Sequence, residues 1–363
     1  MKFKVDKEVL GNSIQTVQNV ITSKATLPIL SNILMETQKE GLRLTATDLD
    51  IGISCVIPVN IQEAGAITIP AKRFGDIIKG LPGDDVSVNT KKNNLVTIET
   101  ESCQFKIMGL ASEEFPVLPT FKDTEVIKIE QVNLKRMLNL TSFAVSFDET
   151  RYVLSGILFK IHKNKIVLVA TDGKRLAIME QELKGNIDKD IQIIVPIKTI
   201  QELIRNLKDE GEVSLSLGSN QALFDLGTVV IISRLIEGEF PDYRQVIPPV
   251  SETKLLLKRE EFLLAVRRAA LLSTPDYQAV KLEVFKNKLV VSKSTPDVGE
   301  SREELSIGYQ GKEMVIGFNP VYLIDVLKNL QNESMELEIT DGEKPGVIRV
   351  NGYVYIVLPM RLG

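Results

Sequence analysis

Few residues in this sequence have the types and spacing that chemistry needs. Asp48 and Asp50 stand two apart in Thr47-Asp48-Leu49-Asp50, and paired carboxylates of this kind can hold a magnesium ion. The run is at least as typical of a solvated turn, and no further acidic ligands cluster beside it. The only histidine, His162, has no second histidine as a partner for a metal or acid–base site, so a surface position on a strand is favoured.

The usual phosphate-binding and nucleotide-binding loops are absent from the sequence. Neither Gly-x-x-x-x-Gly-Lys nor a Gly-x-Gly-x-x-Gly after a strand occurs. Asp172-Gly173 resembles a kinase metal-binding turn, but the other kinase signatures are missing. We therefore expect no catalytic residue, no metal and no cofactor. An enzyme that acts on a phosphorylated substrate through Asp48 and Asp50 remains the alternative.

The stretches around Asp48 and Asp172 also share a pattern. Ala46-Thr47-Asp48 and Ala170-Thr171-Asp172 each follow an alternating apolar strand, and they lie about 125 residues apart. An offset of this size predicts an internal duplication.

The surrounding elements support that prediction, because strand, helix and further strands follow one another twice in each block of about 120 residues. Proline-containing segments with Phe115-Pro116 and Phe240-Pro241 close the first two blocks. The second helix of every block carries the same apolar spacing: Phe74, Ile77, Ile78 and Leu81; Ile200, Leu203, Ile204 and Leu207; Leu323, Val326, Leu327 and Leu330. We predict an α+β protein of three similar domains with antiparallel sheets, at 1–122, 123–247 and 248–363.

Composition agrees with a large apolar core. The chain has 363 residues, of which 44% are hydrophobic, and no apolar run reaches the roughly 18 residues of a membrane span. The N-terminus has no apolar signal core, and Cys55 and Cys103 lie in unrelated contexts. We expect a cytoplasmic protein.

The charge distribution is uneven although the net charge is only −4. The six expected helices, 7–21, 71–81, 131–146, 196–208, 257–272 and 320–330, hold fourteen basic and six acidic residues, so they carry +8 and the remainder about −12. A shared basic helix face is typical of a protein that binds the phosphate backbone. An ordinary solvated helix surface remains the alternative.

Several motifs in register resemble the bacterial DNA sliding clamps, the β subunits of DNA polymerase III. The resemblance covers the whole chain and includes Thr26-Leu27-Pro28-Ile29-Leu30, Ala46-Thr47-Asp48-Leu49, Arg151-Tyr152 with Leu154 and Gly156, Ala170-Thr171-Asp172-Gly173 with Arg175-Leu176-Ala177, Phe240-Pro241-Asp242-Tyr243-Arg244, Gly317-Phe318-Asn319 and Pro359-Met360-Arg361-Leu362.

The resemblance implies a head-to-tail homodimeric ring of six similar domains. Strands would form the outer wall, and helices would line a hole around duplex DNA, bound without sequence preference. Such a processivity factor has no activity of its own and is an accessory subunit of a DNA-directed DNA polymerase, a nucleotidyltransferase. It tethers the polymerase and so raises its effective concentration at the primer end. Its partners would be the replicative polymerase catalytic subunit, the clamp loader, and other polymerases and repair proteins that bind through short peptides.

The resemblance also implies roles for individual residues. The partner-peptide groove would involve Leu154, Thr171, Gly173, Lys174, Arg175, Leu176, Pro241, Val246, Asn319, Tyr322, Leu358, Pro359, Met360 and Arg361. DNA contacts would involve Lys24, Lys72, Arg151 and Tyr152. The dimer interface would involve Arg73, Phe105, Leu271, Leu272, Glu300, Glu303 and Glu304.

Two groove positions depart from the pattern. Lys174 stands where some relatives carry histidine, and Gln245 stands where some carry arginine, so the polar rim differs while the apolar floor is kept. A scaffold that only displays the groove, without binding DNA, is a further alternative.

Overall fold

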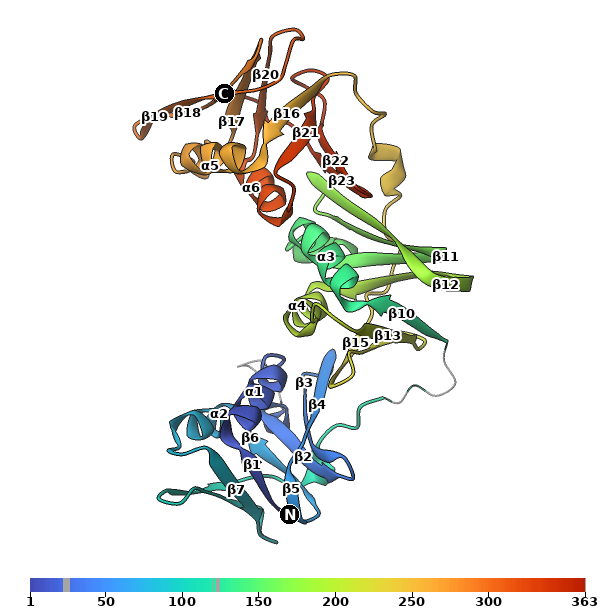
Figure 1. Ribbon diagram of the computed structural model, residues 1–363, viewed down its shortest axis with the longest axis vertical. Helices are drawn as coiled ribbons and strands as arrows, with labels where there is room; N and C mark the ends of the chain where they lie inside the picture. The colour runs from blue at the N-terminus through green and yellow to red at the C-terminus, as the bar shows by residue number, and fades with distance from the viewer. Residues whose placement is uncertain (22–26, 120, 122–124, 363) are drawn as a thin grey trace. The chain divides into compact units, whose positions relative to one another are not determined.

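The computed structural model describes residues 1–21, 27–119, 121 and 125–362, and in these ranges the chain forms two compact units (Figure 1). Unit 1 comprises Met1–Lys135 and Lys198–Leu235, and unit 2 comprises Arg136–Ile197 and Ile236–Gly363. All strand pairings between the named strands are antiparallel. The α+β class with antiparallel sheets is therefore confirmed.

Unit 1 contains two sheets. Its elements are β1 (Lys2–Asp6), α1 (Lys7–Gln18), β2 (Asn32–Gln38), β3 (Gly41–Thr47), β4 (Ile51–Ile57), β5 (Asn60–Glu63), β6 (Ala66–Pro70), α2 (Ala71–Gly80), β7 (Asp85–Thr90), β8 (Leu95–Glu99), β9 (Gln104–Met108), β10 (Val126–Glu130), α4 (Ile197–Asn206, from its second residue), β13 (Glu212–Leu217), β14 (Gln221–Asp225) and β15 (Val229–Arg234). The strand orders are β5-β1-β7-β8-β9 and β10-β13-β14-β15-β4-β3-β2-β6.

Unit 2 also contains two sheets. Its elements are α3 (Gln131–Thr141, from Arg136), β11 (Gly156–Thr171), β12 (Arg175–Pro196), β16 (Lys254–Lys258), α5 (Arg259–Ala270), β17 (Val280–Phe285), β18 (Lys288–Thr295), β19 (Gly299–Ser306), β20 (Met314–Phe318), α6 (Pro320–Asn329), β21 (Ser334–Glu338), β22 (Gly346–Val350) and β23 (Tyr353–Val357). The strand orders are β11-β12-β23-β22-β21-β16 and β19-β18-β17-β20.

Short 3₁₀ segments complete the chain. They are η1 (Pro28–Ser31), η2 (Ser112–Glu114), η3 (Ser142–Ala144), η4 (Glu149–Leu154) and η5 (Tyr243–Val246). None of the described helices has the length and apolar character that crossing a bilayer requires.

The internal duplication is visible in the strand register. Where neighbouring blocks share a sheet, Ile53 of β4 lies opposite Ile231 of β15, and Ala177 of β12 lies opposite Tyr355 of β23. Both partners of the second pair are displaced by 124 residues from those of the first. Equivalent side chains of the two strand pairs therefore point to the same face of their sheets. A shift of one residue in either pairing would have moved them to the opposite face.

The helices also repeat. The N–H groups of Lys7, Gln131 and Arg259, each the first residue of a helix, donate to a carbonyl oxygen in the loop that follows the second helix of the same block, over 2.6–2.9 Å. Leucine follows each second helix directly, and its N–H donates to the carbonyl four residues earlier, at Leu81, Leu207 and Leu330. Their predicted apolar faces are largely buried: Phe74, Ile200 and Leu323 have no exposed surface.

The apolar patterns did not predict every strand. Leu154 lies in η4, and the apolar alternation on both sides of His162 belongs to one long strand, β11. The strand β19 was not predicted, because its exposed sequence Gly-Glu-Ser-Arg-Glu-Glu-Leu-Ser has no apolar face.

Candidate functional site

A tight turn joins β11 to β12 and contains four of the predicted groove residues. The Asp172 Oδ1 atom accepts hydrogen bonds from the N–H groups of Lys174 (2.8 Å) and Arg175 (3.0 Å). The Thr171 hydroxyl donates to the Arg175 carbonyl (2.6 Å) and accepts from the Gly173 N–H (3.0 Å). Gly173 has φ +85°, a conformation that glycine adopts at little cost. Thr, Asp and Gly thus build the turn rather than a metal site.

The same turn occurs at Thr47–Ile51 in unit 1. Asp48 Oδ1 accepts from the N–H groups of Asp50 (3.0 Å) and Ile51 (2.9 Å), and the Thr47 hydroxyl donates to the Ile51 carbonyl (2.9 Å). The Asp48 Oδ2 atom pairs with the Lys198 ammonium group. Within the described ranges no three His, Cys, Asp or Glu residues are placed to hold a metal ion. Both carboxylate oxygens of Asp48 are therefore engaged within the chain, whereas the Asp50 side chain is exposed.

Arg175 is almost completely buried, with 7% of its side chain exposed. Its Nε donates to Asp172 Oδ2 (3.0 Å), its Nη1 to Asp325 Oδ2 (2.6 Å), and its Nη2 to the Phe143 carbonyl. The guanidinium carbon lies 4.4 Å from the centroid of the Tyr322 ring. The structure therefore brings Arg175 and Tyr322 together, as the groove prediction requires. Because the Arg175 side chain is buried, it supports the neighbouring segments and does not form the rim of the groove.

An apolar cluster covers the face of the six-stranded sheet that carries Leu176. Its buried members are Leu158, Val169, Leu176, Ile178, Ile194, Ile236, Val347 and Ile356. The segment after β15 crosses this face and places Phe240, Tyr243 and Ile247 against the cluster, half-buried. Pro241 and Val246 lie between these contacts and remain exposed. Apolar groups of this kind, with one side open, are what a peptide groove needs.

The C-terminal tail passes beside the same turn. The Leu358 N–H donates to the Lys174 carbonyl (2.9 Å), and the Met360 N–H donates to the Gly317 carbonyl (2.8 Å), two residues before Asn319. Leu358 is 44% exposed, and Pro359 and Met360 are half-buried. Segments from the second and third blocks therefore meet in unit 2. Sequence reasoning missed Phe143, Asp325 and Ile247, which carried no motif of their own. Phe240 and Tyr243 stood in a recognised motif but were not among the predicted groove residues.

The predicted DNA residues have different surroundings. Lys72 is exposed in the first turn of α2, and Tyr152 is 61% exposed in η4. Arg151 is exposed, but its Nη1 donates to the Asp172 carbonyl (2.9 Å) and lies against Gly173, where a Cβ atom would come within 2.6 Å. Lys24 lies outside the described residues.

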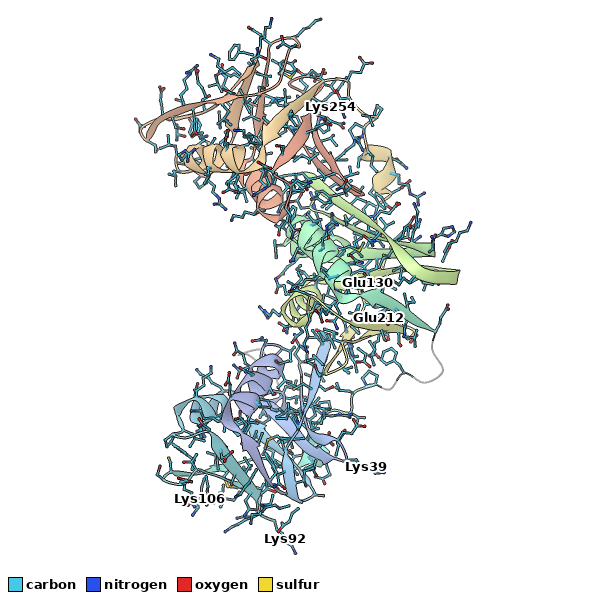
Figure 2. All side chains as sticks on the ribbon, in the orientation of Figure 1. Lys39, Lys92, Lys106, Glu130, Glu212 and Lys254 are labelled. Atoms are coloured by element: carbon cyan, nitrogen blue, oxygen red, sulfur yellow. The ribbon has the colours of Figure 1, made fainter. Side chains whose placement is uncertain are left out.

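The helices carry less charge than expected, because several end earlier. With the observed bounds they hold twelve basic and six acidic residues, a net charge of +6. Half of these cations have partners within the chain: Lys7, Lys135, Lys198, Arg205, Arg259 and Arg268. No described residue pairs with the other half, namely Lys72, Arg73, Lys79, Arg136, Arg267 and Lys328. Exposed lysines also occur away from the helices, for example Lys39 and Lys92 (Figure 2).

The predicted interface residues lie at or near two sheet edges. In unit 1, β9 is an edge strand, and its Phe105 is 40% exposed and lines a shallow hollow with Lys72 and Arg73. In unit 2, β19 is an edge strand that carries the three predicted acids Glu300, Glu303 and Glu304.

Leu271 and Leu272 follow α5, next to the acids of β19. Leu271 is 81% exposed, whereas Leu272 is half-buried. Arg268 donates twice to Glu303 (2.8 and 2.6 Å), and this pairing lowers the pKa of Glu303. Part of the predicted acidic border is therefore already neutralised within the chain.

Comparison with known proteins gives a consistent answer along the chain. Three domain families of the DNA polymerase III beta subunit match it: the N-terminal domain at residues 1–119, the central domain at 128–242 and the C-terminal domain at 244–361. The beta sliding clamp of Chlamydia pneumoniae is 34% identical, over 100% of this chain and 99% of that protein. That of Staphylococcus aureus (strain Mu50) is 32% identical over 99% of both chains.

Solved structures agree with these sequence matches. The sliding clamp of Bacillus subtilis superposes with a TM-score of 0.95 at 31% identity, over 100% of both chains. A sliding clamp of Pseudomonas aeruginosa bound to griselimycin superposes with a TM-score of 0.94 at 31% identity, again over 100% of both chains.

Proposed function

The chain belongs to the DNA polymerase III beta subunit family, and from its geometry we propose how it works as the processivity factor, or sliding clamp, of that polymerase. The observation that carries the proposal is the threefold repeat, matched domain by domain along the whole chain. Two copies supply six similar domains, at 1–122, 123–247 and 248–363 in each, and close a ring around duplex DNA.

The copies associate head to tail through β9 of one and β19 of the other. Both are edge strands with unpaired backbone groups, which readily accept a further strand. Phe105, Leu271 and Leu272 supply apolar contacts, with Arg73 opposite the acids of β19. Glu304 pairs with Arg302 and Glu303 pairs with Arg268 within their own chain. Among the described residues no cation pairs with Glu300, which accepts a hydrogen bond from Ser294, so Glu300 is the partner for Arg73.

The ring holds DNA by enclosure and by contacts to phosphates. Helix cations that pair with no described residue face the duplex, namely Lys72, Arg73, Lys79, Arg267 and Lys328. The exposed Arg151 and Tyr152 join them, and Lys24 adds to them. Phosphate contacts carry no sequence information, so the clamp slides. It acts in the cytoplasm without catalysis of its own, because tethering alone raises the polymerase concentration at the primer end.

Partner proteins bind the apolar groove through short peptides. Leu154, Leu176, Pro241, Val246, Leu358, Pro359 and Met360 supply apolar surface, and Met adapts to varied ligands. Thr171, Gly173, Lys174, Arg361, Asn319 and Tyr322 border it. The polymerase catalytic subunit, the clamp loader and repair proteins compete for this one site in each copy.

Retention on DNA of different topology tests the proposal. The protein is loaded on nicked circles, and half of the sample is then linearised. We expect it to stay on circles and to leave linear DNA through the ends. Equal loss from both would contradict enclosure. A scaffold that does not bind DNA would show no retention on either.

A further inference from the structure

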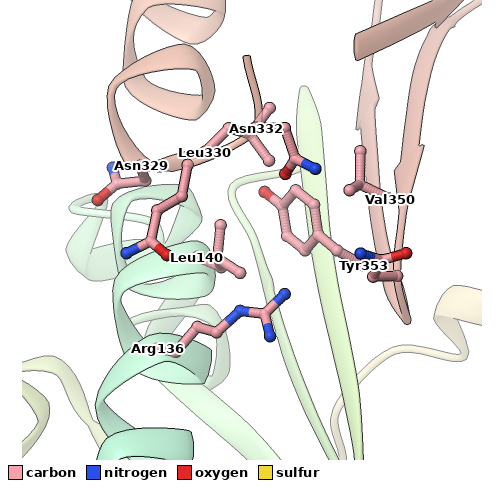
Figure 3. Close-up of a pocket in the computed structure, with 9 residues that line it drawn as sticks. Arg136, Leu140, Asn329, Leu330, Asn332, Val350 and Tyr353 are labelled. Carbon is pink, nitrogen blue, oxygen red and sulfur yellow. The ribbon is translucent and has the colours of Figure 1, made fainter. Parts of the chain in front are cut away.

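A small hollow in unit 2 lies apart from the groove and the sheet edges (Figure 3). Its volume is about 250 Å³, and it is bounded by α3, by the end of α6 with the segment that follows, and by the β22–β23 turn. Its polar lining consists of Arg136, Asn329, Gln331, Asn332, Asn351 and Tyr353.

The hydroxyl group of Tyr353 is the unusual feature of this hollow. Tyr353 is 1% exposed, yet its hydroxyl has no hydrogen-bond partner among the residues that the structure describes. Tyr355, two residues later on the same strand, donates to the Tyr322 carbonyl (2.9 Å). Buried hydroxyls are nearly always paired, so an unpaired one at a hollow points to a ligand atom. In Figure 3 the hydroxyl is directed toward the end where Leu330 and Asn332 lie.

The charge of the lining favours an anion. None of the nine lining residues is acidic, and no described residue pairs with the exposed guanidinium of Arg136. Burial raises the pKa of Tyr353 well above its usual 10, so the phenol stays protonated and can donate. Gln331, Asn332 and Asn351 add amide donors. The Asn329 amide nitrogen already donates to the Asp325 carbonyl (2.9 Å).

We propose that this hollow binds the phosphate group of a nucleotide, either free or within a single strand of nucleic acid. Arginine forms paired hydrogen bonds with phosphate, and the phenol and the amides supply the further donors that its oxygens accept. The volume is below the roughly 300–1,000 Å³ of sites for drug-sized ligands, which suits one small group. The choice of a nucleotide rests on the proposed function, whereas the anion site rests on the lining alone.

Calorimetric titration of the full chain at constant ionic strength tests the proposal. The ligands are inorganic phosphate, a deoxynucleoside monophosphate, and a short single-stranded oligonucleotide with and without a 5′-phosphate. Tyr353→Phe removes only the unpaired hydroxyl, so it should weaken binding roughly tenfold without lowering the Tm. Arg136→Gln should weaken it by roughly tenfold or more. Arg244→Gln, an equal loss of charge at an exposed position outside the hollow, should leave it unchanged.

The outcomes separate the possibilities. If only the 5′-phosphorylated strand and the mononucleotide bind, the source is a terminal or free phosphate, whereas equal binding of both strands indicates the backbone. Equal affinities of the wild type, Tyr353→Phe and Arg136→Gln would overturn the site. An effect of Arg136→Gln alone would also overturn it, because a surface charge would then suffice. Retention on DNA circles, measured with the same variants, tests enclosure separately: a variant that stays on circles but loses phosphate binding leaves the clamp function intact.

Discussion

Arg175 joins segments that lie far apart in the sequence. Its guanidinium holds Asp172 in its own turn, Asp325 of α6 and the Phe143 carbonyl, and it stacks on Tyr322. Each of its three nitrogens donates a hydrogen bond, and a buried charge that loses its partner is costly. The residue therefore positions the groove by fixing α6 against the start of β12.

We expect Arg175→Ala to lower the free energy of unfolding by about 3–5 kcal/mol, because two carboxylates lose a buried partner. Arg175→Lys keeps the charge but not the planar fork, and it should recover only part of the loss. Urea unfolding measures both. The control is Arg361→Ala at the exposed tail, which should change stability by less than about 0.5 kcal/mol. Equal stability of the Arg175 and Arg361 variants would show that the network is not structural.

Glu202 of α4 makes stability depend on pH. Its side chain is buried, and burial raises its pKa above the usual 4.5, although Arg205, Lys198 and Asn19 act in the opposite direction. The folded state thus keeps this proton to a higher pH than the unfolded state does. The ionised form disfavours folding, so this contribution to stability is lost as the pH rises from about 4.5 through the raised pKa.

Glu202→Gln cannot ionise, so its stability relative to the wild type should increase from pH 4.5 to neutral pH. Unfolding curves of both proteins across this range measure the difference. Asp225→Asn, at a half-buried aspartate of β14, is the control and should not reproduce the trend. Parallel pH profiles for Glu202→Gln and the wild type would contradict the raised pKa.

At the scale of elements, regular apolar spacing made the six helices and most strands predictable. The helix predictions were correct to within a few residues, because each helix buries one face, as in Phe74 and Ile78 of α2. The strand β19 has no such face and escaped prediction. The burial of Arg175 could not be read from the sequence either, since Asp325 lies 150 residues away.

The C-terminal tail is expected to form part of the groove. The Met360 N–H bonds to the Gly317 carbonyl, and Leu362 lies against Gly317. We expect deletion of Met360–Gly363 to abolish binding of short partner peptides, with little loss of stability, because a terminus rarely carries the core. Calorimetry and a melting curve on the truncated protein check this, with the unaltered full-length protein as the control. Full affinity after truncation would remove the tail from the groove.

The leucines that follow α5 are predicted to contact the second copy of the chain. Leu271 is 81% exposed, so Leu271→Glu should leave the fold intact and place a charge in the apolar contact. Loss of one buried leucine would cost about 1.5–3 kcal/mol, before the cost of a buried carboxylate. Sedimentation should show monomers for this variant. Leu256→Glu changes a leucine on β16 that is 53% exposed, and it should stay dimeric. A dimeric Leu271→Glu protein would refute the interface.

At the scale of the whole molecule, one duplicated unit explains both the sheets and the charge. The pairing register recurs after 124 residues, so helices with similar faces recur as well. The six helices carry +6 although the chain carries −4, which leaves −10 for the rest. An asymmetry of this kind attracts DNA to the helices and repels it from the strands.

The helix cations that have no partner in the chain are expected to contact phosphates. Each contact contributes about 0.9 to the slope of log K against log salt concentration, so changing Lys72, Arg267 and Lys328 to Gln should reduce the slope by about 2–3. The charge-matched control changes Lys39, Lys92 and Lys286 in exposed hairpin turns to Gln and should leave the slope nearly unchanged. Binding to duplexes of several sequences over a salt series measures both triple variants. Equal reductions of the slope by both triple variants would mean that net charge, rather than the helix face, binds DNA. A loss of binding confined to some duplex sequences would mean base recognition, which a sliding ring excludes.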